Sequence, residues 1–126
     1  MDPGSCCPFC NPHTKDVLAR NGLCYARWDI FPVSAGHMLV IPFRHSTDFF
    51  SMTADERHAV DDLVVECKTL LEKTHRPAGY NVGYNVGVVA GQTVMHSHCH
   101  VIPRYAGDVV DPRGGIRGVI PGRRQC

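Results

Sequence analysis

The chain has 126 residues, with 13 basic and 12 acidic side chains and a formal net charge of +1, and this length predicts one domain. The balanced charge gives no general basis for binding nucleic acid or an anionic membrane. No apolar run approaches the ~18 residues that span a bilayer, and "MDPGSCCPFC" lacks the basic and apolar regions of a secretory signal. We therefore expect a cytoplasmic protein.

The cysteine content supports the same compartment. Seven cysteines, an odd number without an export signal, favour a reducing environment and free thiols. Cys24, Cys67 and Cys99 lie within apolar stretches, and we expect them to be small core residues. The remaining N-terminal cluster, in "SCCPFC", requires a separate explanation.

Two short strands are predicted in the first third of the chain. The first is "LCYARWDIFPV", residues 23–33, which we expect to end at Pro32. The second is "GHMLVIP", residues 36–42, which proline again ends. The pairs Asn21-Gly22 and Ala35-Gly36 are turn signals before them.

One helix is predicted between Thr53 and about Thr74. Thr53 and Glu56 have the spacing of a capping box, and Arg76-Pro77 ends the segment. Between these limits, apolar side chains recur at helical spacing and form one stripe: Val60, Leu63, Val64, Cys67, Leu70 and Leu71. Such a helix must cover one face of a sheet.

Two further strands are predicted after the helix. They are "YNVGYNVGVVAG", residues 80–91, and "HSHCHVIPRY", residues 96–105, joined by a loop around residues 91–93. The tail from residue 108 shows little periodicity. Strands, one main helix and further strands predict an α+β fold with a mainly antiparallel sheet.

Histidines occupy every second position at the start of the last strand: His96, His98 and His100. Side chains two apart on a strand share a face, so these three would line one side while Ser97 and Cys99 face a core. Along a straight strand the three would extend over about 13 Å, too far to bind one zinc ion together. Because imidazole is an effective nucleophile at phosphorus, the row favours catalysis by the middle ring.

The loop before the histidines, "AGQTVMH", offers donors for an anion. Gly91 allows a close backbone approach, and Gln92 and Thr93 add an amide and a hydroxyl. Such groups suit phosphate oxygens and the charge that develops in a transition state. The pattern therefore indicates a substrate that contains phosphate.

The segment "CPFC", residues 7–10, has the spacing of a zinc knuckle, because two thiolates so placed can bind one Zn²⁺. A second C-x-x-C does not follow, so the other two ligands must come from elsewhere in the sequence. A redox-active dithiol, and a site that uses Cys6 or His13, are the alternatives.

Several segments together resemble a known family. "AGQTVMHSHCHVIPR" resembles the signature of the histidine-triad (HIT) nucleotide hydrolases and transferases. "DIFPVSAGHMLVIPFRH" is similar to the upstream half of that family, and "NVGVVAGQ" to its Asn-x-Gly before the loop. The resemblance covers roughly Cys7 to Asp108. It implies a HIT-like fold as a single domain over residues 1–126, with a knuckle at 6–13, a tail at 108–126 and a sheet continued across a homodimer.

The resemblance also implies the chemistry. His98 would attack the α-phosphorus of a nucleoside phosphoanhydride or phosphoramidate, and water would then release a nucleoside monophosphate from a nucleotidyl-histidine. His100 would contact the α-phosphate, and His37 would orient the nucleophile. Asp29 is expected to bind the ribose. The residues expected around the phosphates and the leaving group are Asn85, Gln92, Thr93 and Val94.

A structural zinc site follows from the same resemblance. Some family members complete a Cys-x-x-Cys pair with two histidines, whose positions here are His45 and His96. The implied ligands are therefore Cys7, Cys10, His45 and His96, which leaves His96 outside the catalytic step.

The favoured function is hydrolysis of dinucleoside polyphosphates such as diadenosine tetraphosphate, with an adenine nucleotide as the expected ligand. Three alternatives stay open: a phosphoramidate hydrolase that uses His98, a nucleotide-binding scaffold with weak catalysis, and a metal-dependent enzyme that uses His96 and His98 as an H-x-H pair. Basic side chains of the tail could grip a polyphosphate or be solvated: Arg113, Arg117, Arg123 and Arg124.

Overall fold

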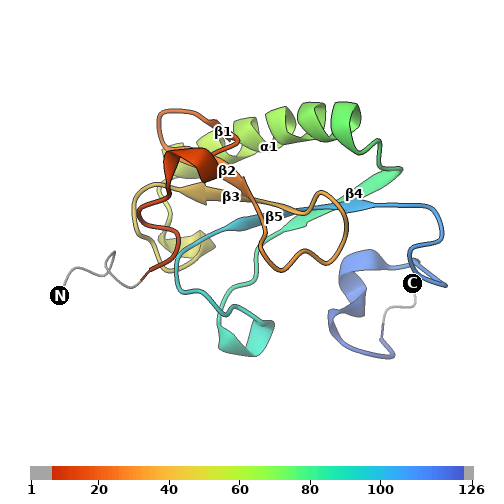
Figure 1. Ribbon diagram of the computed structural model, residues 1–126. Coiled ribbons are helices and arrows are strands. Elements are labelled where there is room, and N and C mark those ends of the chain that lie inside the picture. The colour runs from red at the N-terminus through yellow and green to blue at the C-terminus, as the bar shows by residue number, and fades with distance from the viewer. Residues whose placement is uncertain (1–6, 124–126) are drawn as a thin grey trace.

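The computed structural model describes residues 7–123, so Cys6 and Arg124 lie outside the described part (Figure 1). Within it, five strands form one antiparallel sheet in the order β1-β2-β3-β5-β4. The strands are β1 (Ala19–Arg20), β2 (Cys24–Trp28), β3 (Met38–Pro42), β4 (Gly79–Gly83) and β5 (Cys99–Arg104). The helices are α1 (Ala54–Thr74) and the short 3₁₀ helices η2 (Thr14–Asp16), η3 (Phe49–Ser51), η4 (Val88–Ala90) and η5 (Gly115–Val119).

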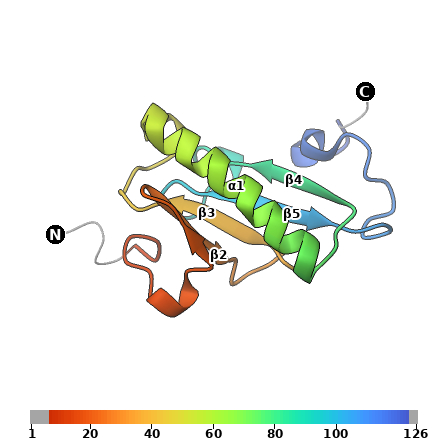
Figure 2. The same ribbon diagram turned by 90° about the horizontal axis from the view of Figure 1, so that it is seen from above.

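The core lies between α1 and one face of the sheet (Figures 1 and 2). Its buried members from the sheet are Cys24, Ala26, Met38, Val40, Cys99 and Val101. Those from the helix are Val60, Leu63, Cys67 and Leu71. The predicted apolar stripe and the three predicted core cysteines are thus confirmed, as is the α+β fold with a mainly antiparallel sheet.

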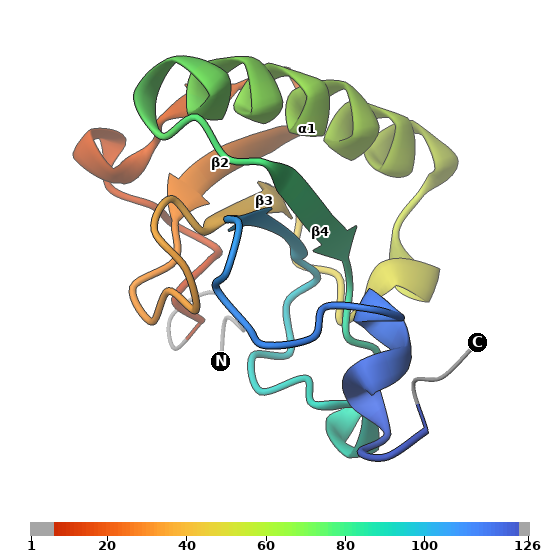
Figure 3. The ribbon, with the colours of Figure 1, turned by 90° about the vertical axis from the view of Figure 1, so that its right-hand side faces the viewer.

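The opposite face of the sheet carries the loops that matter for function. Tyr25, Leu39 and Ile41 alternate with the core residues of β2 and β3, and they pack with Phe9 in a second buried cluster. Figure 3 shows the segment around η4 and the C-terminal tail on this side, away from α1. Leu39 pairs with His100 across β3 and β5, so His100 points to the same face.

All four predicted strands were too long, and two of them extended well past the observed ends. β2 ends at Trp28 because Asp29 turns the chain, its carboxylate accepting from the Phe31 N–H. β4 ends at Gly83 and is followed by η4, which Gly87 and Gly91 bound with φ angles of 90° and 98°. Such angles are open to glycine and break the extended run that the valines indicated. The short strand β1 was not predicted.

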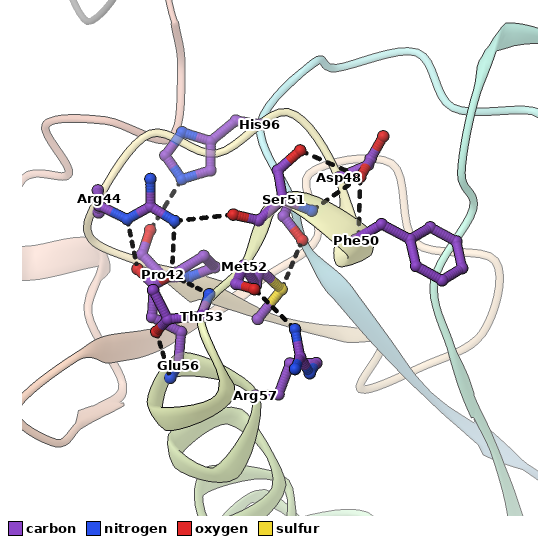
Figure 4. A network of polar contacts seen from close by, with 11 residues as sticks. Pro42, Arg44, Asp48, Phe50, Ser51, Met52, Thr53, Glu56, Arg57 and His96 are labelled. Carbon is purple, nitrogen blue, oxygen red and sulfur yellow. Dashed lines mark hydrogen bonds and ion pairs between the residues drawn. The ribbon is translucent and has the colours of Figure 1, made fainter.

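The helix begins as the sequence indicates. Thr53 Oγ1 accepts from the Glu56 N–H at 3.0 Å, and Glu56 Oε1 accepts from the Thr53 N–H at 2.8 Å, which is a complete capping box. Glu56 is 4% exposed and also accepts two bonds from Arg44, at 2.7 and 3.0 Å (Figure 4). Arg44 further donates to the Ser51 carbonyl at 2.9 Å. This network ties the segment after β3, which carries His45, to the start of α1.

Replacing Glu56 with alanine is expected to lower the free energy of unfolding by about 2 kcal/mol. The variant loses the helix cap and the hydrogen bonds to the half-exposed guanidinium of Arg44. Glu66→Ala, at an exposed position of the same helix, is the matched control and should change it by less than about 0.5 kcal/mol. Urea unfolding followed by circular dichroism measures both. Equal effects in the two variants would contradict a special role for Glu56.

Candidate active site and metal centre

The loop between β2 and β3 places Asp29 beside His37. The Asp29 N–H donates to the His37 carbonyl at 2.9 Å. Gly36 has a φ of +86°, and a Cβ there would lie 2.9 Å from the side chain of Leu71 at the end of α1. Glycine therefore lets the loop pack against the helix while it delivers His37 to β3.

His37, His100 and Asp29 form one hydrogen-bonded group. His37 Nδ1 accepts from the Val33 N–H at 3.1 Å, which leaves the proton of the neutral ring on Nε2. His37 Nε2 lies 3.0 Å from His100 Nδ1 and 3.4 Å from Asp29 Oδ2. Because His100 Nδ1 accepts, the proton of neutral His100 lies on Nε2. His100 can therefore donate from Nε2 to an oxygen of a ligand.

Burial keeps these two histidines uncharged at neutral pH. It lowers the pKa of His37 against the opposing effect of Asp29. It lowers the pKa of His100 to about 4, helped by the nearby His98 and His37. Ligand atoms of Asp29, His37 and His100 lie within 4.8 Å of one another, a spacing that a metal could bridge. The proton on His37 Nε2 instead assigns this group to hydrogen bonding.

His98 has its ring fixed by one short hydrogen bond. Its Nδ1 lies 2.7 Å from the His96 carbonyl oxygen, which can only accept, so Nδ1 carries the proton and Nε2 keeps a lone pair. The His98 ring is 9% exposed and packs edge-on against Phe9 and His100, with centroid distances of 5.1 Å to each. Phe9 was not predicted as part of the site. Its position between the two cysteines of "CPFC" was the available signal.

The prediction that all three histidines lie on one strand is wrong. β5 begins at Cys99, so only His100 of the three lies within it. The Ser97 N–H donates to the Ser46 carbonyl at 2.6 Å, outside the ladder of the sheet. The chain therefore bends before β5, and the distances expected along a straight strand do not apply to His96 and His98. Ser97 is buried, as expected for a side chain that faces away from the site.

A cavity of about 310 Å³ brings most of the predicted site residues together. The predicted members of its lining are Asp29, Asn85, Thr93, Val94, His98 and His100. Arg27 and Gly91 also line it, and the rest of the lining is apolar or aromatic: Pro8, Phe9, Trp28, Ile30, Phe31 and Leu39. A mostly apolar pocket with a few converging polar groups is the usual form of a small-molecule site.

Gln92 lies outside the lining of this cavity. Its side chain is 3% exposed, and its amide is fully engaged within the chain. Oε1 accepts from the Gly87 N–H at 2.9 Å, and Nε2 donates to the carbonyls of Thr47 and Val94 at 2.6 and 3.0 Å. Gln92 thus holds the loop between β4 and β5, and its predicted contact with a phosphate stays a prediction.

The four predicted metal ligands come together in a second group, with all ligand atoms within 4.8 Å of one another. His96 Nε2 donates to the Pro42 carbonyl at 2.8 Å (Figure 4), so its Nδ1 keeps a lone pair. That Nδ1 lies 3.3 Å from Cys7 Sγ and 3.4 Å from Cys10 Sγ. His45 Nδ1 lies 3.1 Å from Cys10 Sγ.

This donor set fits a tetrahedral Zn²⁺. Sulfur and nitrogen ligands at ~2.3 and ~2.1 Å from one ion lie about 3.6 Å apart, close to the distances found here. Two thiolates and two neutral imidazoles balance the charge of the ion, and burial lowers the pKa of His96, which favours its neutral form. Four protein ligands leave no open position, so a metal held here would be structural.

Comparison with known proteins agrees with this geometry. Residues 11–107 match the HIT domain. The chain is 34% identical over 93 residues to an AP-4-A phosphorylase from Mycobacterium tuberculosis, covering 73% of this chain and 48% of that protein. It is 35% identical over 97 residues to an asymmetrical bis(5'-nucleosyl)-tetraphosphatase from Schizosaccharomyces pombe, covering 77% and 53%. Other similar proteins carry the name uncharacterized HIT-like protein.

A solved structure of the same fold contains a bound metal. The crystal structure of a Zn-bound histidine triad family protein from Mycobacterium smegmatis superposes with a TM-score of 0.76 at 27% identity, covering 86% of this chain and 81% of that one. The fold, the histidine row and these matches define a HIT protein. The chain belongs to the HIT domain family. Among residues 7–123 there is no helix with the length and hydrophobicity to span a membrane.

Proposed function

We propose that this protein is a nucleotidyl hydrolase that cleaves dinucleoside polyphosphates at the α-phosphate. The observation that carries the proposal is the hydrogen bond from His98 Nδ1 to the His96 carbonyl, because it leaves Nε2 as a nucleophile in a fixed tautomer. The names of two relatives, a phosphorylase of AP-4-A and an asymmetrical tetraphosphatase, support the same substrate class.

The cavity beside His98 matches the parts of a nucleoside monophosphate. Its apolar lining, including Phe9, Phe31 and Leu39, suits a purine base, and the Asp29 carboxylate suits the ribose hydroxyls. The α-phosphate would then lie between His98 and the Nε2–H of His100. An uncharged His100 donates to a phosphate oxygen without repelling a cationic His98 after attack.

The reaction would proceed in two displacements. His98 Nε2 forms a bond to the α-phosphorus while the bond to the bridging oxygen breaks, and the nucleoside polyphosphate leaves as an anion with the electron pair. The His98 imidazolium created in this step is stabilised by the His96 carbonyl at Nδ1. Water then attacks the same phosphorus and loses one proton to solvent, the P–N bond breaks with its electron pair returning to His98 Nε2, and the nucleoside monophosphate leaves.

We further propose that Cys7, Cys10, His45 and His96 hold a structural Zn²⁺, which the donor set and the Zn-bound relative support. The predicted homodimer stays a prediction. β4 forms one edge of the sheet in the described chain, the position at which a second copy could extend it.

The purified protein should convert diadenosine tetraphosphate to AMP and ATP. In ¹⁸O-labelled water the label should enter AMP, because water discharges the nucleotidyl group from His98. Because the P–N bond of a nucleotidyl-histidine is labile in acid, the reaction is quenched at high pH, and mass spectrometry should then show an adenylyl group on the peptide that contains His98. Label in ATP alone would place the attack at the β-phosphorus and overturn the proposal.

An adenosine phosphoramidate, assayed in parallel, tests the phosphoramidate alternative with the same nucleophile. Faster turnover of the phosphoramidate by about tenfold or more in kcat/KM would favour that alternative. Binding of AMP without turnover of either compound would favour the scaffold.

A further inference from the structure

A second and larger cavity lies against the sheet face that carries the site. It measures about 740 Å³ and extends from His37, Asn85 and His100 at one end to Ile116 and Val119 of η5 at the other. Figures 1 and 3 show the tail that contains η5 on the same side of the sheet as η4, with β4 and β5 above. The C-terminal tail is therefore one wall of this cavity.

The two cavities meet at the reaction centre. Asn85 and His100 line both of them, whereas His98 lines only the smaller one. If the α-phosphate lies between His98 and His100, the nucleoside that becomes part of AMP would lie in the smaller cavity. The group that leaves would extend past His100 and Asn85 into the larger cavity.

The lining of the larger cavity suits an apolar or aromatic group more than bare phosphates. Apolar side chains predominate in it, including Val82, Ile102, Val109, Ile116 and Val119. Among the described lining residues, Arg104 is the basic side chain that carries a permanent charge. It donates two hydrogen bonds of 2.8 Å to Asp108. Burial lowers the pKa values of His37 and His100, which removes their positive charge near neutral pH.

The segment that leads into the tail is fixed to the rest of the fold. Arg104 Nη1 donates to Asn81 on β4 at 2.7 Å, and the Tyr105 hydroxyl donates to the Ala35 carbonyl at 2.6 Å. The turn before η5 uses Gly114 and Gly115, with φ angles of 88° and 47° that favour glycine. The two hydrogen bonds thus hold the chain that leads into the tail beside β4 and beside the loop before His37.

We propose that this cavity is the subsite for the leaving group, and that it binds the second nucleobase of a dinucleoside polyphosphate against the C-terminal tail. This inference rests on the proposed function, and it assigns the selection of dinucleotides over mononucleotides to Val82, Ile102 and Ile116. A second base buries apolar surface there, whereas a terminal phosphate meets no unpaired cation in the described lining.

Diadenosine tetraphosphate and adenosine 5'-tetraphosphate test the inference, because they differ only in the second adenosine. The wild-type protein should favour the dinucleotide by about tenfold or more in kcat/KM. Ile116→Asp should remove most of that preference by lowering kcat/KM for the dinucleotide alone. Ile120→Asp, a charge at a similarly exposed position of the tail that does not line the cavity, is the control and should keep the preference. AMP should bind all three proteins with equal Kd.

Equal kcat/KM for the two substrates in the wild type would overturn the subsite and leave the hydrolase intact. An unchanged preference in Ile116→Asp would also overturn it, and a changed sedimentation coefficient in that variant would then identify the cavity as a contact between copies. Turnover of neither substrate by the wild type would overturn both the subsite and the proposed function.

Discussion

His98→Ala is expected to reduce hydrolysis of diadenosine tetraphosphate by about a thousandfold or more in kcat, because no P–N bond can form without the Nε2 lone pair. The residual rate would come from substrate binding and from donors such as the Nε2–H of His100. Binding of AMP should persist, because Asp29 and the apolar lining of the smaller cavity are untouched. Steady-state kinetics and calorimetric titration with AMP measure the two effects separately.

The matched control is His58→Ala, which removes an exposed imidazole from α1 and should leave kcat within about twofold. A circular dichroism spectrum and a melting temperature equal to those of the wild type would exclude unfolding of the His98 variant. A His98→Ala protein that kept more than a tenth of wild-type activity would contradict nucleophilic catalysis by His98.

Local signals explain why the helix was predictable. The capping box of Thr53 and Glu56 and the spacing of Leu63 and Cys67 depend on residues within a few positions of each other, and the structure reproduces both. The path before β5 was not predictable in this way. It depends on the Ser97 N–H finding the Ser46 carbonyl, about fifty residues earlier in the sequence.

The same limit applies to the three histidines. Their alternation indicated a shared site, but the distinct environments of two of them come from groups far away in the sequence. His96 is set by the Pro42 carbonyl, and His100 by the His37 ring. Family resemblance supplied the expected roles. The hydrogen bonds now give a physical reason why Nε2 keeps a lone pair in His98, the proposed nucleophile, and why Nδ1 keeps one in His96, the proposed ligand.

Removal of the proposed zinc ion is the second change with a large expected effect. If free zinc exceeds its Kd by about a thousandfold, binding stabilises the fold by about 4 kcal/mol, so chelation should lower the melting temperature by about 10 °C or more. Without chelator, Cys10→Ser should have a melting temperature similar to that of the chelated wild-type protein. Adding chelator should change the melting temperature of this variant little. Elemental analysis should find one zinc ion per wild-type chain and much less in the variant.

The proposed metal centre is also joined to His98, the proposed nucleophile, by two contacts. The His96 ring offers Nδ1 to the cysteines while the His96 carbonyl accepts from His98 Nδ1. Phe9, between Cys7 and Cys10, packs on the His98 ring, and its carbonyl accepts from the Tyr25 hydroxyl at 2.6 Å. Loss of the metal should therefore slow hydrolysis by about tenfold or more at temperatures where the protein stays folded, although the metal contacts no substrate.

His13→Ala separates this ligand set from the alternative that the sequence left open. The His13 side chain is exposed and is absent from the group of four ligand atoms, so the variant should retain zinc, melting temperature and activity. Zinc content lost in His13→Ala and retained in Cys10→Ser would contradict the assigned ligands. The chelated wild-type protein could instead lack zinc and still keep full activity and an unchanged melting temperature. That result would show that the four side chains pack without a metal and that the hydrogen bond alone orients His98.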